Sequence, residues 1–438
     1  MTGFRHAIPW GNAPVIEADR KAEFFIDNKS GNGPQIGACG DLYQFGAIME
    51  AIELSPIDYL FTGEGSQPIT FAFVYSQRLD AKILQASLIE ALGHFPILQS
   101  QLRARRASDL EFFLTDGGLS FDVVMSRREF APSDQIDQYI APVKTIEGEP
   151  MSRITLTQTP QRSVLAISLS HALVDGFSYF HFLSSWARIY RREPIVSPHL
   201  DRTVLNPNSQ AEQPLTAEDI YTRCGLFFGA ARRDSKASKQ NQERLFISED
   251  EIRTQLAAAK QTCQIQCTEN DVIMAHLWKR YLPQWFNGSN VNRCYITCPV
   301  DIRRLLPEFP RNYFGCALCF ATASISRDEL QRASEAELAA LIRKSVNQIK
   351  PPYIWGSVQT LNSFRLQHGL NAMAKIHLRH PTQGMIVTNL TRLPIRELDF
   401  GAGTPEHFLV YTDISSSAAI LASQKGVEVI VVHPDGIE

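Results

Sequence analysis

The segment SVLAISLS, residues 163–170, constrains the fold more than any other, because it contains no charged residue. An apolar run of this length is typical of a strand that is buried on both faces. His171 follows it directly, and Asp175 and Gly176 precede a helical pattern over residues 177–192. We therefore predict that a rigid strand end presents His171 at a tight turn that leads into a helix.

The turn after this strand has a structural and a catalytic interpretation. In the structural one, Asp175 caps the helix and Gly176 relieves the backbone. In the catalytic one, the His171 imidazole, with an ordinary pKa of about 6.5, takes a proton from a substrate. Ser170 directly precedes His171, so the two side chains should lie on opposite faces of the strand and form no Ser/His pair. Asp175 is expected to brace the loop and not to act as a triad acid.

Strand-like and helix-like patterns alternate along the rest of the chain, which indicates a mixed α/β fold. Thr268 is the expected N-cap of one helix. We expect strands over residues 68–77, 152–160, 293–300, 316–325, 384–390 and 425–433, and helices over residues 81–95, 268–286 and 334–349.

The length of 438 residues exceeds one typical core and predicts two lobes of roughly 200 residues each. The first fifty residues are rich in Gly, Pro and Asn, and we expect them to be irregular. We assign residues 1–195 to an N-terminal lobe that includes this extension, residues 196–222 to an inter-lobe crossover rich in Pro, Asn and Gln, and residues 223–438 to a C-terminal lobe.

Charge and composition limit the classes of partner that the protein is expected to bind. The net charge of -3 and the lack of a long Lys/Arg block argue against nucleic acid and favour a small molecule. No apolar run approaches the ~20 residues of a membrane span, so we expect no membrane partner. No secretion signal is evident, so we expect a cytoplasmic protein. We also expect a monomer. Eight scattered cysteines suggest reduced thiols, and Cys316 and Cys319 lie in a strand pattern, so no metal is expected.

Three segments carry a resemblance to a known family. The motif HALVDG resembles the HxxxDG signature of the acyltransferase superfamily that includes chloramphenicol acetyltransferase, condensation domains and the BAHD acyltransferases. The segment ELDFGAGTP is similar to the BAHD element DFGWG, with Ala402 in place of Trp. The segment CPVDIRRLLPEFPRNYFGCAL is similar to the DxR and YFGN elements, with Cys316 in place of Asn. The matching residues of these last two segments are Asp301, Arg303, Tyr313, Phe314, Gly315, Asp399, Phe400, Gly401 and Gly403.

A weaker echo is the segment ELSPIDYLF, residues 53–61, which resembles the opening strand of the family. The resemblance implies an α/β fold of two chloramphenicol-acetyltransferase-like lobes, each a mixed β-sheet with flanking helices, and an active-site tunnel between them. It also implies that Asp175 is structural and pairs with Arg303, and that Asp399 and Gly401 shape a loop. Acyl-CoA is then a co-substrate, and no bound cofactor is implied.

The implied reaction moves an acyl group from acyl-CoA to a hydroxyl or amine of a small molecule, as in specialised metabolism. His171 acts as the base, without a covalent acyl-enzyme. Thr388 and Asn389 are candidate donors to the oxyanion, although a strand-end Asn or Thr also commonly only shapes a turn. Two alternatives stay open: a condensation- or cyclisation-type enzyme that uses a carrier protein, and a non-catalytic binding protein. Ser170 stands where condensation domains usually have a second His, which favours acyl-CoA.

Overall fold

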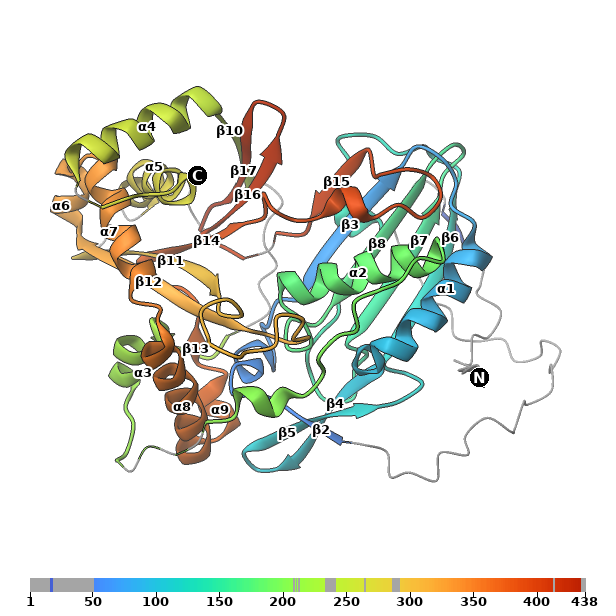
Figure 1. Cartoon of the computed structure of the whole chain (residues 1–438), viewed down its shortest axis with the longest axis horizontal. Coiled ribbons are helices and arrows are strands. Elements are labelled where there is room, and N and C mark those ends of the chain that lie inside the picture. Colours follow the sequence, from blue (N-terminus) through green and yellow to red (C-terminus); the bar gives the residue numbers. More distant parts are fainter. Residues whose placement is uncertain are drawn as a thin grey trace.

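Two six-stranded mixed sheets, one in each lobe, form the frame of the molecule in a computed structural model (Figure 1). The first fifty residues, expected to be irregular, lie outside the described residues except for one short strand. The structure describes residues 16–18, 51–207, 209, 211, 213–232, 242–263, 265–285, 292–412 and 414–434.

The sheet of the N-terminal lobe has the order β1-β6-β7-β8-β3-β15. Its apolar strand β8 is paired antiparallel on both sides, with β7 and with β3, and all of its residues are buried. This placement explains why the segment carries no charge, as predicted. The strands are β1 (Ile16–Ala18), β6 (Leu119–Ser126), β7 (Ser152–Gln158), β8 (Ser163–Leu169), β3 (Ile69–Tyr75) and β15 (His407–Val410).

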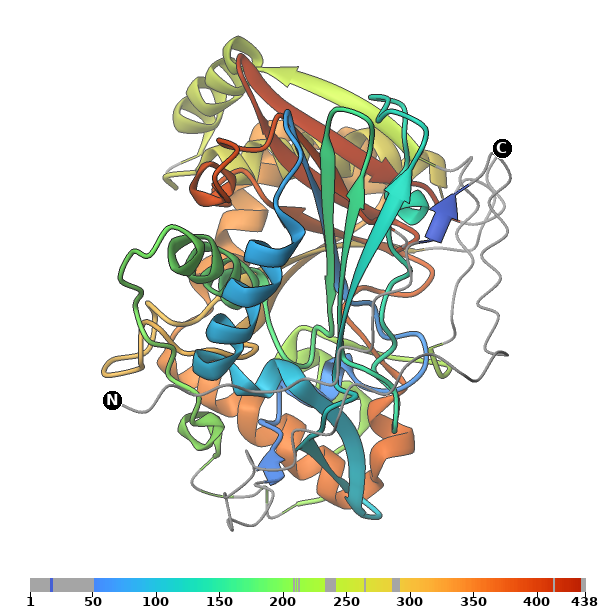
Figure 2. The same cartoon turned by 90° about the vertical axis from the view of Figure 1, so that its right-hand side faces the viewer.

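Helices α1 (Ala81–His94) and α2 (Gly176–Tyr190) pack against each other and cover one face of this sheet (Figure 2). Both were predicted, to within two residues at each end. Three further strands form a small sheet at the end of the lobe: β2 (Ala51–Glu53), β4 (Ser100–Arg106) and β5 (Asp109–Leu114).

Strand β15 departs from the predicted division of the chain. It belongs to the segment that we assigned to the C-terminal lobe, yet it pairs antiparallel with β3, from His407 opposite Val74 to Val410 opposite Phe71. It thereby covers the edge of β3, where the backbone groups would otherwise lack partners. The chain therefore returns to the N-terminal lobe before it ends.

The sheet of the C-terminal lobe has the order β10-β17-β16-β14-β11-β12, and four helices lie on its outer side, away from the N-terminal lobe (Figure 1). The predicted N-cap Thr268 donates to the Asp271 carboxylate at the start of α5. The strands are β10 (Gln242–Ser248), β17 (Gly426–Val432), β16 (Ser417–Ser423), β14 (Gly384–Asn389), β11 (Arg293–Asp301) and β12 (Leu318–Ser326), and the helices are α4 (Glu249–Thr262), α5 (Glu269–Trp285), α6 (Arg327–Arg332) and α7 (Glu335–Asn347).

The crossover and the region beside it connect the two frames. The crossover pairs with the YFG segment, because the Phe314 N–H donates to the His199 carbonyl at 2.8 Å. Helix α3 begins at Ala217, inside the predicted crossover. The remaining elements are α3 (Ala217–Cys224), α8 (Pro351–His368), α9 (Leu370–Met373), β9 (Phe227–Phe228), β13 (Ile376–His377) and the short 3-10 helices η1 (Asp58–Phe61), η2 (Pro96–Gln99), η3 (Ile136–Gln138), η4 (Arg202–Leu205) and η6 (Ile395–Glu397).

The segment that resembled an opening strand is not one beyond Glu53, where β2 ends. It turns and forms the 3-10 helix η1 instead. The Asp58 carboxylate accepts a hydrogen bond from the Ser55 N–H at 2.8 Å, and the Asp58 N–H donates to the Ser55 carbonyl at 3.0 Å. These local bonds close a turn that an extended backbone cannot make.

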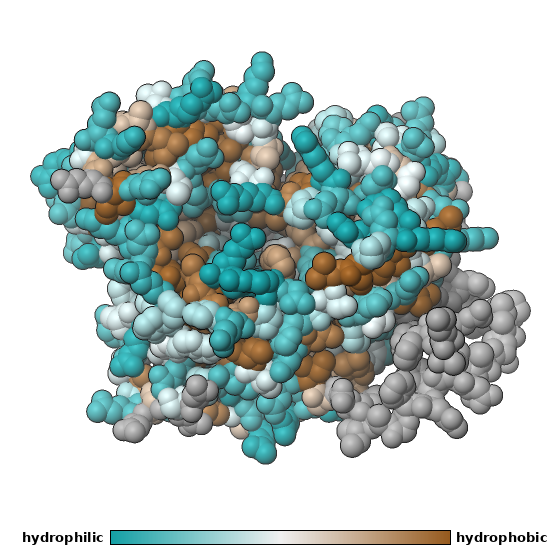
Figure 3. Space-filling model, in the orientation of Figure 1, coloured by the Kyte–Doolittle hydropathy of each residue, from teal (hydrophilic) through white to brown (hydrophobic). Residues whose placement is uncertain are grey.

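The surface of the molecule is mixed. Figure 3 shows hydrophilic side chains over much of one face, with hydrophobic patches near its middle. Among the described residues, no helix is both long and apolar enough to cross a membrane. The same part of the chain contains no cluster of three or more His, Cys, Asp or Glu side chains with the geometry of a metal site.

Candidate active site

His171 stands where strand β8 ends. The Leu173 N–H donates to the Ser170 carbonyl at 3.0 Å, which closes the turn directly after the strand. The Ser170 hydroxyl is buried and bonded to the Thr145 hydroxyl at 2.7 Å. Ser170 therefore holds the turn and is not paired with His171, as its position next to the histidine indicated.

The His171 ring lies flat on the ring of Phe61 from η1. Their centroids are 3.9 Å apart and the planes differ by 6°. Nδ1 is enclosed, with no hydrogen-bond partner of ordinary geometry among the described residues, whereas Nε2 is not enclosed. Nε2 is thus the nitrogen that a substrate can reach.

Burial lowers the pKa of the His171 imidazole from its ordinary value. The nearby backbone of His171 and Val174 and the Asp175 carboxylate favour the charged form, but they offset this effect only in part. The imidazole is therefore neutral near pH 7 and able to accept a proton.

Asp175 caps helix α2 and is fully committed to structural partners. Its carboxylate accepts from the Ser178 N–H at 2.9 Å and from the Ala317 N–H at 3.0 Å. The Arg303 guanidinium binds both oxygens, at 2.7 and 3.0 Å. Burial alone would raise the pKa of this carboxyl, but Arg303 and the two N–H donors hold it below its ordinary value.

Arg303 joins the two lobes through the same buried contact. It follows β11 in the C-terminal lobe, whereas Asp175 belongs to the N-terminal lobe, and both side chains are almost completely buried. Its Nη2 also donates to the carbonyls of Tyr313 and Gly315, at 3.1 and 3.0 Å. A side chain at Gly315 would place its Cβ 2.6 Å from the Tyr313 hydroxyl, so this turn of the YFG segment requires glycine.

The DFGAG loop lies at the opposite end of α2. Asp399 accepts from the N–H groups of Gly401 and Gly403, at 2.8 and 3.0 Å, and Phe400 packs edge-on against Trp186 at 4.9 Å. The 15 residues of α2 span about 22 Å between this end and the His171 turn. The distance supports the structural role that the resemblance implies for Asp399 and Gly401.

Thr388 and Asn389 end strand β14, and their side chains point to opposite faces of the sheet. The Asn389 amide donates to Asn270 of α5 at 2.9 Å, and its oxygen accepts from the Thr391 N–H at 2.9 Å. Asn389 therefore lies on the helix-covered face. The Thr388 hydroxyl points away from α5, is not enclosed, and lacks a hydrogen-bond partner within the described chain. Their role toward an oxyanion stays a prediction.

Sequence reasoning missed a second buried ion pair beside His171, between Asp58 of η1 and Arg202 of η4. The signal was present, since Asp58 is the one charged residue in the apolar run SPIDYLF. An isolated carboxylate in such a run requires a buried partner. The structure thus gathers His171, Asp175 and Arg303 at one point and adds this pair to them.

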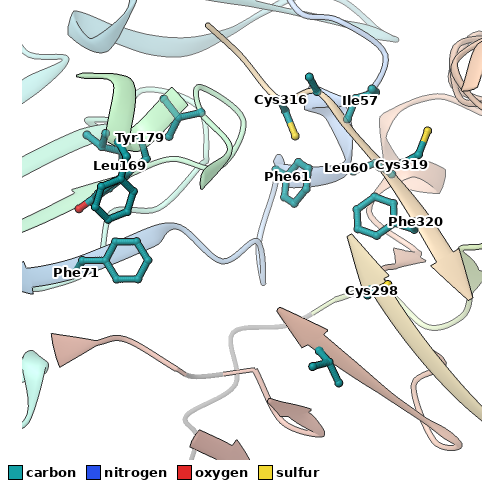
Figure 4. Packing of buried hydrophobic residues seen from close by; sticks show 14 of the residues in the cluster. Ile57, Leu60, Phe61, Phe71, Leu169, Tyr179, Cys298, Cys316, Cys319 and Phe320 are labelled. Carbon is teal, nitrogen blue, oxygen red and sulfur yellow. The ribbon is translucent and has the colours of Figure 1, made fainter. Parts of the chain in front are cut away.

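The core around η1 is apolar and contains several thiols. Figure 4 shows Ile57, Leu60 and Phe320 beside one another, and the Cys316 sulfur points toward the Phe61 ring. Burial raises the pKa of the Cys316 thiol well above its ordinary value, so the thiol stays protonated. Cys316 is therefore a packing residue next to the site and not a nucleophile.

Comparison with known proteins places this geometry in context. A model described as the Transferase family matches residues 49–436. The chain is 23% identical to the hydroxycinnamoyl-CoA:piscidic acid hydroxycinnamoyltransferase of Actaea racemosa, over 82% of this chain and 88% of the relative. It is 24% identical to anthranilate N-benzoyltransferase protein 1 of Dianthus caryophyllus, over 76% of this chain and 77% of that relative.

Among solved structures, F. graminearum TRI101 complexed with coenzyme A and deoxynivalenol matches with a TM-score of 0.71 at 15% identity. The match covers 88% of this chain and 95% of that structure. At this level of identity the likeness shows the fold, and it confirms the expected α/β architecture of two lobes.

Proposed function

Since the chain belongs to the Transferase family, the BAHD acyltransferases, we propose that it transfers an acyl group from acyl-CoA to a hydroxyl or amine of a small molecule. The relatives named above are a hydroxycinnamoyltransferase and an N-benzoyltransferase, and the first of them is named for a hydroxycinnamoyl-CoA donor. We therefore choose an aromatic acyl group, such as hydroxycinnamoyl, as the first donor to test.

The observation that carries the proposal is the state of His171. It stands at the end of a buried strand, its ring is fixed against Phe61, and Nε2 is the nitrogen that stays accessible. Burial keeps the ring neutral near pH 7. These are the requirements of a general base that meets two substrates between two lobes.

In the proposed reaction, Nε2 of His171 removes the proton of the acceptor hydroxyl or amine as its oxygen or nitrogen attacks the thioester carbonyl. The tetrahedral intermediate expels the thiolate of coenzyme A, which takes the proton back from the imidazolium. Protons and charges balance without a covalent acyl-enzyme. Asp175 takes no proton, because Arg303 occupies both of its oxygens.

The oxyanion of the intermediate requires a fixed donor, and such a donor contributes roughly 3 to 4 kcal/mol in comparable acyl-transfer sites. We propose Thr388 for this role before Asn389. The hydroxyl of Thr388 is available, whereas both polar groups of Asn389 are already bonded to Asn270 and Thr391.

The test is release of free coenzyme A thiol from hydroxycinnamoyl-CoA and acetyl-CoA in the presence of alcohols and amines. We expect His171→Ala to lower the rate by about 100-fold or more, the usual range of general-base catalysis. His94→Ala is the matched control, because His94 is exposed at the end of α1, and it should leave the rate unchanged. Undiminished thiol release by His171→Ala would remove His171 from the role of base.

A parallel arm separates the donor classes. The same acyl group is offered on coenzyme A and on a carrier protein, with the same acceptor. We expect turnover with acyl-CoA, and turnover with the carrier alone would support a condensation-type enzyme. A light-scattering measurement of the same sample checks the expected monomer.

A further inference from the structure

A second buried ion pair holds the turn that presents His171. Nη1 of Arg202 donates to the Asp58 carboxylate at 2.6 Å. Asp58 is 0% exposed and Arg202 3% exposed. Two charges so deeply buried carry a large desolvation cost, which their mutual attraction offsets only in a well-formed geometry.

Both terminal nitrogens of the Arg202 guanidinium also contact the His171 turn. Nη2 donates to the Leu173 carbonyl at 2.7 Å, and Nη1 also approaches the Ala172 carbonyl at 3.3 Å. These are the two residues that follow His171. One guanidinium from the crossover therefore holds the backbone of the turn and the carboxylate of η1 together.

The same short helix carries Phe61, the ring on which His171 lies. The other side of η1 is held by Arg232 of the C-terminal lobe, which donates to the carbonyls of Leu60 and Thr62. Phe61 thus lies between two residues, Leu60 and Thr62, whose carbonyls are both bonded to Arg232. This matters for His171 because the Phe61 ring lies flat against the imidazole and limits the directions in which it can turn.

The Asp58–Arg202 pair and the Asp175–Arg303 pair act on different parts of the turn. Arg303 binds Asp175 at the start of α2, whereas Arg202 binds the carbonyls of residues 172 and 173. The Cys316 thiol lies near both pairs, because the charges of all four residues influence its pKa. Loss of one pair therefore leaves the other anchor in place.

We propose that Asp58 and Arg202 are positioning residues that fix the direction of the His171 imidazole, by holding its turn and Phe61 in one arrangement. The inference rests on the proposed function of His171 as the base. Fold stability alone does not require an ion pair here, because uncharged side chains of similar size often replace a buried pair without loss of stability. The geometry of the imidazole does depend on it, because each carbonyl contact sets the path of the turn.

The test uses the double variant Asp58→Asn/Arg202→Met, which leaves no uncompensated charge and keeps an acceptor for the Ser55 N–H. We expect near-normal thermal stability and KM, with kcat lowered about 10- to 100-fold, as for a reacting group displaced by about 1 Å. The single variant Arg202→Lys keeps the charge and loses the forked contact, so it should fall between the double variant and the wild type.

The matched control is Asp134→Asn/Arg128→Met. It removes a different ion pair of the same lobe, a bidentate one with both contacts at 2.8 Å, whose hydrogen bonds among the described residues do not reach the His171 turn. This control should keep the wild-type kcat. A wild-type kcat in Asp58→Asn/Arg202→Met would overturn the inference and leave the pair a purely structural one.

If the double variant does not fold, the variant Phe61→Leu tests the same inference. It leaves both ion pairs and removes the stacked ring, and we expect the same loss of kcat with little change in KM. Wild-type kcat in Phe61→Leu would also overturn the inference. His171→Ala is measured in parallel. If His171→Ala retains its activity, the proposed base is wrong, and this result is distinct from a failure of the positioning pair.

Discussion

The guanidinium of Arg303 binds both carboxylate oxygens of Asp175, 128 residues earlier in the chain, and thereby fastens the C-terminal lobe to the turn that presents His171. Both side chains are nearly inaccessible to water. The contact fixes the start of α2, the direction of the turn and the approach of the two lobes at one point. The same pair of residues therefore stabilises the contact between the lobes and sets the position of the proposed base.

Asp175→Ala should destabilise the protein strongly, because Arg303 would keep its charge in a buried place without its main partner. Breaking one side of such a pair typically costs about 3–5 kcal/mol. We expect a large drop in the thermal unfolding temperature, together with loss of activity. Asp301→Ala is the control, because Asp301 also contacts Arg303, at 3.1 Å, but is about half exposed and should matter little. A form of Asp175→Ala that is inactive yet as stable as the wild type would contradict the scaffold role.

The pH dependence of kcat/KM should report the lowered pKa of His171. The neutral imidazole is the base, so activity should rise with pH through a pKa below about 6.5 and then level off. Folding stability should also rise with pH over this range, because burial disfavours the charged imidazole. The contribution of His171 to stability is present above its pKa in the unfolded chain and is lost as the pH falls through its pKa in the folded protein. Asp175 stays ionised throughout, because its own pKa is lowered. An acid limb at or above the ordinary pKa of histidine would contradict burial as the controlling effect.

Much of the fold follows from local pattern. The uncharged run of β8 correctly predicted a buried strand, and the apolar stripe of α5 correctly predicted a helix of nearly the observed length. The first turn of α2 begins at Gly176 because Asp175 caps it, which is also a local property. The family elements, and not the periodicity, identified Arg303 as the partner of Asp175.

The parts that sequence could not supply depend on distant contacts. Strand β15 has only four residues and is defined by its pairing with β3, more than 300 residues earlier. The resemblance of residues 53–61 to a strand failed because Asp58 closes a local turn. Arg202 lies in a crossover without periodicity, and its role appears only when the fold brings it to Asp58 and to the carbonyls after His171.

Gly401→Ala should lower stability without changing the chemistry. Gly401 has φ +80°, and a Cβ there would lie 3.0 Å from Cε1 of Tyr190 on α2. A left-handed backbone costs about 1–2 kcal/mol for a residue with a side chain, and the contact adds to it. Gly403→Ala is the matched control, with φ +78° and no atom within 4 Å of the new Cβ. We expect both variants to unfold at a lower temperature, Gly401→Ala the more so, with kcat unchanged while they are folded. A lowered kcat in folded Gly401→Ala would bring this loop into the active site.

Thr388→Val and Asn389→Ala should distinguish the roles of two neighbouring residues whose side chains lie on opposite faces of the sheet. Thr388 presents an available hydroxyl on the face away from α5, so its loss removes a donor from the oxyanion and should lower kcat by about 100-fold, with little effect on KM. Asn389 bonds to Asn270 and Thr391, so its loss should lower thermal stability slightly and leave kcat within a few-fold of the wild type. Valine preserves the shape and the strand preference of threonine, so a fall in kcat isolates the hydroxyl. The reverse pattern, with Asn389→Ala slow and Thr388→Val normal, would require the Asn389 amide to leave Asn270 during catalysis and would assign the donor to the other face of β14.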